Sequence, residues 1–128
     1  MHTWHNPPTV AKPPSKHAQA VETAPGLRWL HISGQIGLDR DGKLADSEIG
    51  QHRQIWQNIL NLLAAANMTR EHLVRVCCYV TRPDQIASYR ITRDEALQGV
   101  EVASTAVVVA ALARPEGVVE MEAVAAPP

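Results

Sequence analysis

The sequence predicts an α+β domain in which two helices cover one face of a mixed β-sheet. Strand-like alternation and helix-like spacing of apolar residues follow one another in the order strand, strand, helix, strand, helix, strand, strand. The 128 residues suit a single compact domain. Hydrophobic residues make up 45% of the chain and aromatic residues only 4%, so Val, Ile, Leu and Ala must build the core.

The N-terminal residues 1–16 contain four of the nine prolines and predict an irregular arm, followed by one domain at 17–128. Residues 17–22 predict a short strand. The sequence LRWLHIS at 27–33 alternates as a second strand, and the Ala-Pro-Gly turn at 24–26 joins the two as an opening hairpin. The chain then leaves the sheet through a tight Asp-Gly turn.

The longest helix is predicted in ADSEIGQHRQIWQNILNLLAAANM, where apolar residues recur at helical spacing. Asp46 or Ser47 can cap its start, and Asn67 can close it. The strand HLVRVCCYVT at 72–81 follows, with Val76 and Cys78 on one face.

A second helix is predicted in RPDQIASYRITRDEALQG, with Asp84 as a plausible cap. STAVVVAAL is apolar on both faces, which predicts a central strand. The last strand, at 118–125, places Glu120 and Glu122 opposite an apolar face. Two helices cover only one side of the sheet, so an oligomer that packs sheet on sheet is expected to cover the other.

Composition excludes several classes of function. The net charge of −1 and the lack of a basic run argue against a general nucleic-acid surface. No apolar run is long enough to span a membrane, and the N-terminus lacks the apolar core of a signal peptide, so a cytoplasmic protein is expected. Cys77 and Cys78 are adjacent on a strand, so we expect reduced thiols. No metal site is expected, because no paired Cys or His ligands occur.

Four blocks of the chain resemble the RidA family, also called YjgF/YER057c/UK114. They cover residues 17–125 in order and read HISGQIGLDRDGKL, QHRQIWQNILNLLAAANM, HLVRVCCYVT and ASTAVVVAALARPEGVVEMEAVA. The resemblance implies a chorismate mutase-like fold and a homotrimer with three clefts between neighbouring copies. It also implies hydrolysis of a small reactive enamine or imine metabolite to a keto acid and ammonia, without metal or cofactor.

The resemblance also points to site residues. Glu120 matches the family glutamate that positions water, and Ser33 and Gly34 belong to the Ser-Gly-Gln block. Members that read Ala-Arg-Ser on the penultimate strand hold the substrate carboxylate with that arginine, but Ser104 stands at this position here, followed by Thr105. With this Ala-Ser-Thr ("AST") form the chain resembles another branch of the family. A neutral hydroxyl cannot make the bidentate, charge-assisted clamp that a guanidinium makes on a carboxylate.

His17 takes the place of the family tyrosine, so Glu120 and His17 are the candidate acid–base residues. Ser33, Gly34, Ser104 and Thr105 are the candidate substrate contacts. Each candidate also has a structural explanation: a turn for the Ser33 block, backbone capping for Ser104 and Thr105, a solvated or salt-bridged Glu120, and a surface His17. The positive charge that Ser104 lacks can come from an arginine on an earlier element, namely Arg75, Arg90 or Arg93. The alternative is that all three arginines are solvated.

Three functions follow from these residues. The first is a deaminase-type hydrolase that uses Glu120. The second is a trimeric binding or sensing module that kept the cleft and lost the chemistry, which the serine at 104 favours. The third is the old family label of endoribonuclease, which the balanced charge and the scarcity of aromatic stacking residues disfavour.

Overall fold

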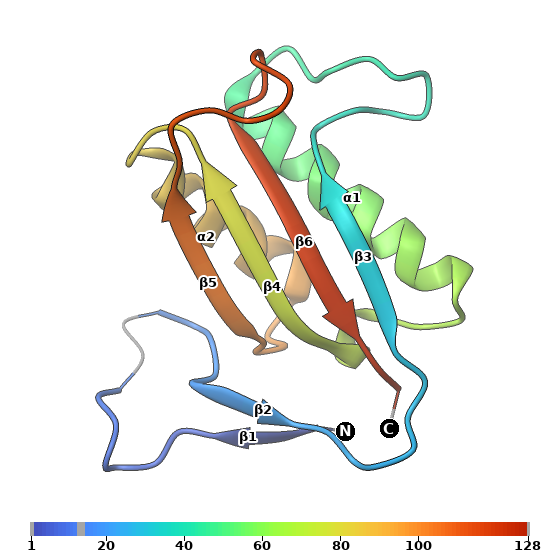
Figure 1. The fold of residues 1–128 in the computed structure, drawn as a ribbon, viewed down its shortest axis with the longest axis vertical. Helices are drawn as coiled ribbons and strands as arrows, with labels where there is room; N and C mark the ends of the chain where they lie inside the picture. The colour runs from blue at the N-terminus through green and yellow to red at the C-terminus, as the bar shows by residue number, and fades with distance from the viewer. Residues whose placement is uncertain (1, 13–14, 128) are drawn as a thin grey trace.

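The computed structural model of the chain describes residues 2–12 and 15–127. Its main sheet has the strand order β3-β6-β4-β5. These strands are β3 (Leu30–Gln35), β4 (Leu73–Val80), β5 (Ala103–Val108) and β6 (Val119–Ala125). The helices α1 (Glu48–Ala65) and α2 (Gln85–Leu97) lie on one face of this sheet (Figure 1). A short 3-10 helix at Arg70–His72 precedes β4. The predicted α+β architecture is confirmed.

The N-terminal region differs from the prediction. The strand β2 (Ala20–Glu22) pairs with β1 (Thr3–His5) in a separate two-stranded antiparallel sheet, which lies beyond one end of the main sheet (Figure 1). The predicted hairpin with the 27–33 segment is therefore wrong, and the N-terminal arm is not irregular throughout. A three-residue strand is too short to show the alternation by which strands are recognised in a sequence.

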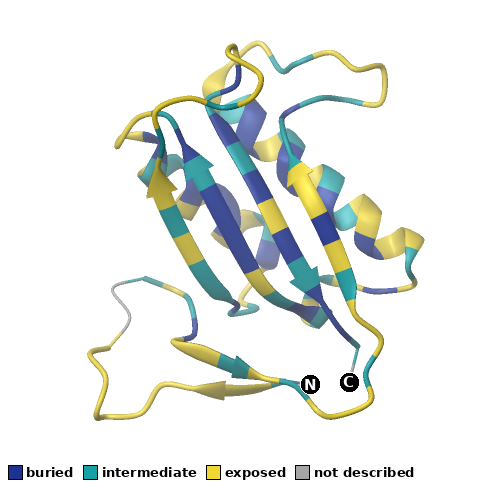
Figure 2. Cartoon of the chain, viewed as in Figure 1, coloured by how far each residue is buried: buried dark blue, intermediate teal, exposed yellow. Residues whose placement is uncertain are grey.

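The prediction of a central strand in the Ala103–Val108 region is wrong as well. β5 lies at the edge of the sheet, where it pairs in parallel with β4 and forms an isolated bridge from Ala103 to Ala18 on its other side, while β6 occupies the interior. Val107 remains 41% exposed, and Figure 2 shows β5 as a strand of half-buried and exposed residues. A strand that is apolar on both faces is predicted to be buried on both faces. The sequence does not show whether the residues that bury it belong to the same chain or to a neighbouring copy.

The helices follow the predicted signals closely. The Ser47 side chain accepts a hydrogen bond of 3.0 Å from the Gly50 backbone N–H and caps α1. Asn67 follows the helix with a positive φ of 56°, a conformation that asparagine tolerates well. Asp84 occupies the cap position of α2, but its carboxylate accepts hydrogen bonds from Arg82 instead of capping the helix.

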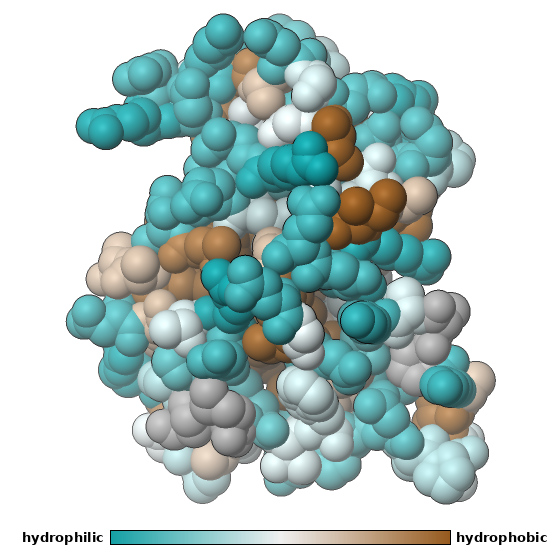
Figure 3. Space-filling model, turned by 180° about the vertical axis from the view of Figure 1, so that it is seen from behind, coloured by the Kyte–Doolittle hydropathy of each residue, from teal (hydrophilic) through white to brown (hydrophobic). Residues whose placement is uncertain are grey.

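The core lies between the helices and the sheet. Its fully buried members include Ile55, Ile59 and Leu63 of α1, Val76 of β4 and Met121 of β6. The far side of the helices is mainly hydrophilic (Figure 3). The two helices therefore cover one face of the sheet, and no helix or strand of the described residues covers the opposite face, called the open face below.

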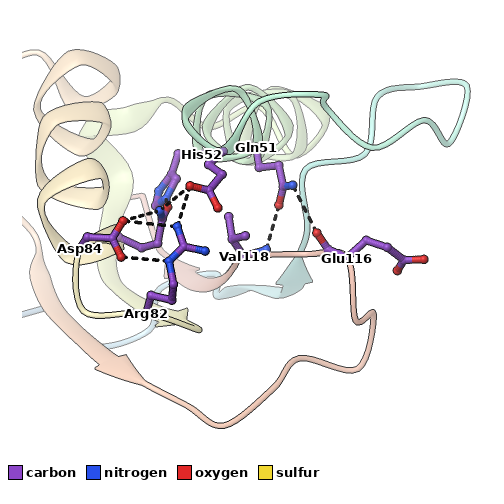
Figure 4. Close-up of polar contacts among 8 residues, drawn as sticks. Gln51, His52, Arg82, Asp84, Glu116 and Val118 are labelled. Atoms are coloured by element: carbon purple, nitrogen blue, oxygen red, sulfur yellow. Dashed lines mark hydrogen bonds and ion pairs between the residues drawn. The ribbon is translucent and has the colours of Figure 1, made fainter.

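A polar network fixes the start of β6 (Figure 4). The Gln51 side chain of α1 accepts a hydrogen bond of 2.9 Å from the Val118 N–H and donates one of 3.5 Å to the Glu116 carbonyl. Its neighbour His52 is fully buried and lies 2.8 Å from the Gln85 side-chain oxygen. These contacts tie α1 to the two loops beside it and hold β6 in register, so they position the strand that carries Glu120.

Candidate functional site

The strand register decides which candidate side chains share a face. Tyr79 pairs with Glu120, and Cys77 pairs with both Glu122 and Thr105, so these side chains point to the open face. Their strand neighbours point toward the helices. Cys77 and Cys78 thus face opposite sides and stay free thiols, as predicted, and burial raises the pKa of the Cys78 thiol to about 12.

Glu120 lies directly against Gly34. Gly34 sits where the pairing of β3 with β6 is irregular, between Ile32 and Gln35. A methyl group added to Gly34 would overlap Glu120 Oε2 and lie 3.0 Å from Glu120 Cδ. Only glycine leaves this space to the carboxylate. The structure thus brings Gly34 and Glu120 together, while Ser33 lines a hollow with Glu122.

The neighbouring carboxylate, Glu122, is already engaged. The Tyr79 hydroxyl donates a hydrogen bond of 2.7 Å to Glu122, and this bond raises the pKa of Tyr79 to about 12. Among the described residues, none forms a hydrogen bond or ion pair with the Glu120 carboxylate. Glu122 therefore has a structural partner, while Glu120 remains available to a ligand or to water.

A hollow of about 270 Å³ lies on the open face beside these groups. Its lining includes Ser33 and Glu122 together with His31, Arg75 and Cys77. Arg75 is the only one of the three candidate arginines in this lining. Glu120 is not among the lining residues, so the hollow of one chain does not include this candidate acid–base residue.

Ser104 lies on the other face of the sheet. Its register partner is the core residue Val76, and its hydroxyl is 2.5 Å from the hydroxyl of Tyr89 on α2. Thr105 points to the open face, so one chain does not place the two hydroxyls in one site. Neighbouring residues on a strand alternate between faces, and for the same reason no small ligand can contact both Ser104 and Glu120 of one chain.

His17 lies at the outer edge of β5, next to the residue that bridges to Ala103. Ala18, the next residue, bridges to Ala103 at the outer edge of β5. The Nδ1 atom of His17 is 3.2 Å from the Ser15 hydroxyl. Partial burial and the positive charges of Arg93 and Arg90 lower the pKa of His17 below 6.5. His17 therefore belongs with the helix side of the β5 edge.

Two further residues complete this location. Tyr89 is buried, stacks on Trp56 at 6.2 Å between ring centroids, and has its pKa raised to about 12 by that burial. The Arg93 guanidinium lies 5.5 Å from the centre of the Tyr89 ring. We call His17, Tyr89, Arg93 and Ser104 the edge cluster. Tyr89 and Ser104 are 15 residues apart and lie on different elements, so helical spacing alone gives no sign of their contact.

The described ranges, 2–12 and 15–127, contain no helix suited to span a membrane and no cluster of metal ligands. Neither helix there has the length and apolar character needed to cross a bilayer. No three His, Cys, Asp or Glu side chains within the same ranges are close enough to hold a metal ion.

Comparison with known proteins gives consistent matches. The sequence profile of the family described as Endoribonuclease L-PSP matches residues 10–127. Protein HMF1 of Saccharomyces cerevisiae is 34% identical over 99 residues, which cover 76% of this chain and 75% of HMF1. A RutC family protein of Aquifex aeolicus is 37% identical over 75 residues, 58% of either chain.

Solved structures agree with these sequence matches. The Rid-family protein YyfB of Yersinia pestis superposes with a TM-score of 0.84 at 29% identity, covering 98% of both chains. RidA of the Antarctic bacterium Psychrobacter superposes with a TM-score of 0.74 at 28% identity, covering 90% of this chain and 91% of that one.

Proposed function

Because the chain belongs to the RidA family, also described as Endoribonuclease L-PSP, we propose that it hydrolyses a small enamine or imine in a cleft between two copies of itself. One observation carries the proposal more than any other. The Glu120 carboxylate lies over Gly34 on the open face, without a partner among the described residues. A carboxylate held in that way can take a proton from water and pass it on.

The reaction needs water and proton transfer only. Water adds to the imine carbon while Glu120 takes its proton, and a new carbon–oxygen bond forms. Glu120 passes this proton to nitrogen, which gives a carbinolamine. A second proton then moves from the new hydroxyl group to nitrogen, the carbon–oxygen double bond forms as the carbon–nitrogen bond breaks, and the products are a carbonyl compound and ammonia. An enamine enters the same route after its carbon takes up a proton. The Ser33 hydroxyl and the Gly34 N–H are the substrate contacts in this proposal. Gly34 lies against Glu120, and Ser33 lines the neighbouring hollow.

In this proposal a homotrimer brings together Glu120 of one copy and the edge cluster of its neighbour. The open face is uncovered, and Thr105 and the exposed Val107 lie on it. A neighbouring copy that packs there can bring its edge cluster toward Glu120, which the fold of one chain prevents. A trimer has a mass of 3 × 14.0 = 42.0 kDa. The free thiols suit the cytoplasm, the compartment we propose.

The wild-type protein is expected to release ammonia from freshly generated 2-aminoacrylate faster than the spontaneous reaction. Glu120→Gln removes the proton acceptor and is expected to lower this rate by about 10²- to 10⁴-fold. Glu122→Gln is the matched control, because it removes a carboxylate from the same strand face and should keep most of the activity. A wild-type rate equal to the background, or equal rates for Glu120→Gln and wild type, would contradict the proposal.

The second candidate function is a trimer that binds a small carboxylate or carbonyl metabolite without converting it. The hydroxyl of Ser104, bound to Tyr89 at the position of the family arginine, favours this reading. It predicts saturable binding of a 2-keto acid in calorimetry with no ammonia release from the enamine. Endoribonuclease activity ranks last, because the net charge of −1 gives RNA little attraction.

A further inference from the structure

The N-terminal sheet, formed by β1 and β2, is joined to the rest of the molecule at two points. At one point the His2 Nε2 atom is 3.2 Å from the carbonyl oxygen of His72, just before β4. At the other the Ala18 N–H donates a hydrogen bond of 3.0 Å to the Val102 carbonyl, just before β5. The N-terminal sheet therefore lies beside the ends at which β4 and β5 begin (Figure 1).

A hollow of about 620 Å³, called the N-terminal hollow below, is enclosed there. It is lined by His2 and Trp4, by Glu71 and Leu73 where the 3-10 helix meets β4, and by residues 98–101 between α2 and β5. His2 and Trp4 are two residues apart in an extended segment, so their side chains share one face of the N-terminal sheet. His5 and Glu22, which pair at 2.7 Å, belong to its other face. The volume is in the range of small-molecule sites.

Part of this lining is apolar and aromatic. Leu73 is almost fully buried and Val100 is half-buried, so both present carbon surface to the hollow. Trp4 lines the hollow and still keeps 45% of its surface exposed. The face of an indole ring carries negative electrostatic potential and attracts a cation more strongly than the other aromatic side chains do.

The charged part of the lining is acidic. It contains the carboxylates of Glu71 and Glu101, with no Lys or Arg among the described residues that line it. Within the described parts of the chain, neither carboxylate forms an ion pair, and Glu71 accepts only a hydrogen bond of 3.3 Å from the Thr69 hydroxyl. The N–H groups of Gln98 and Val100 donate to carbonyl oxygens of α2 and are not available to an anion. The hollow therefore suits a positive charge.

We propose that the N-terminal hollow binds a small organic ammonium ion that carries an apolar or aromatic body. The ammonium group lies over the Trp4 indole near Glu71 and Glu101, and the body packs against Leu73 and Val100. Two carboxylates alone would attract any cation. The indole and the carbon surface add a preference for an organic cation over a hydrated metal ion, and the described residues offer no third acidic, His or Cys ligand for a metal.

The test uses three ligands that share a phenylethyl body and differ in charge. Phenethylamine, 2-phenylethanol and 3-phenylpropionate are titrated into the full-length protein by calorimetry at neutral pH, where they are a cation, a neutral molecule and an anion. Phenethylamine is expected to bind with a stoichiometry of one per chain and about tenfold or more tighter than 2-phenylethanol. No binding of 3-phenylpropionate is expected at this site.

Two variants assign the binding to the N-terminal hollow. Trp4→Leu keeps an apolar side chain and removes the indole, so it should weaken phenethylamine binding by about 3- to 30-fold. Trp29→Leu is the matched control, because Trp29 is 48% exposed and does not line the hollow. Glu101→Gln should weaken phenethylamine binding several-fold, leave 2-phenylethanol binding unchanged, and cover the case in which Trp4→Leu releases the N-terminal sheet. Its control is Glu116→Gln, an exposed carboxylate outside the lining.

Losses confined to Trp4→Leu and Glu101→Gln support the ammonium site. Equal affinities for phenethylamine and 2-phenylethanol overturn it, and so do equal losses for Trp4→Leu and Trp29→Leu, because they indicate contact with any exposed tryptophan. The N-terminal hollow shares no lining residue with the hollow on the open face, and Glu120 lines neither. Glu120→Gln should therefore bind phenethylamine like the wild type, so the ammonium site and the proposed hydrolase stand or fall separately.

Discussion

Gly34→Ala is expected to lower ammonia release by about 10²-fold or more while the protein stays folded. The added methyl group would occupy the space of Glu120 Oε2. The atom that must move is the far end of a flexible side chain on the open face, so the carboxylate can rotate away at little cost to stability. It then no longer lies over the Ser33–Gly34 backbone. The rate of ammonia release and the thermal unfolding temperature together measure this effect.

Gly50→Ala provides the control for Gly34→Ala. A methyl group at Gly50 would also meet a polar side chain, since its Cβ would lie 2.6 Å from Ser47 Oγ, but this contact is at the start of α1. It should leave the rate of ammonia release unchanged. A Gly34→Ala protein as active as the wild type would mean that the observed position of Glu120 is not the one used in catalysis.

Ile59→Ala is expected to give a large loss of stability, about 2–5 kcal/mol in the free energy of unfolding. Ile59 is fully buried between α1 and the sheet, so truncation leaves a cavity that the packed neighbours fill only in part. Leu62→Ala on the same helix removes a side chain that is 39% exposed and should cost far less. Urea unfolding at one fixed protein concentration measures both, since oligomerisation contributes to apparent stability.

Equal losses for Ile59→Ala and Leu62→Ala would contradict this packing of α1. A larger loss for Leu62→Ala would contradict it more strongly, because it would place the exposed residue in an interface. The comparison therefore tests which side of α1 faces the sheet that carries Glu120.

Local signals in the sequence were sufficient for the helices and for the last strand. Ser47 and Asn67 mark the ends of α1, and the helix occupies the segment between them. The alternation around Glu120 placed this residue on the face opposite Met121, as observed. Periodicity and caps depend on nearby residues only, so a single sequence carries them fully.

Features that depend on distant pairing were not visible in the sequence. The apolar run of β5 is compatible with a central strand and with an edge strand, and its neighbours decide between them. Strand alternation alone could have separated Ser104 from Thr105, although the resemblance to a family block presented them as a pair. The contacts of Ser104 with Tyr89 and of Arg93 with the same ring join separate elements, so only the folded chain reveals the edge cluster.

A subunit-mixing measurement tests the site between two copies most directly. Glu120→Gln removes the proton acceptor, and Ser104→Glu places a repelling charge in the edge cluster, so each variant alone should be inactive. If one copy supplies Glu120 and its neighbour supplies Ser104, mixed trimers assembled from equal amounts should regain about one quarter of wild-type ammonia release, because one site in four then combines two intact halves. A mixture no more active than either variant alone would contradict a site shared between copies.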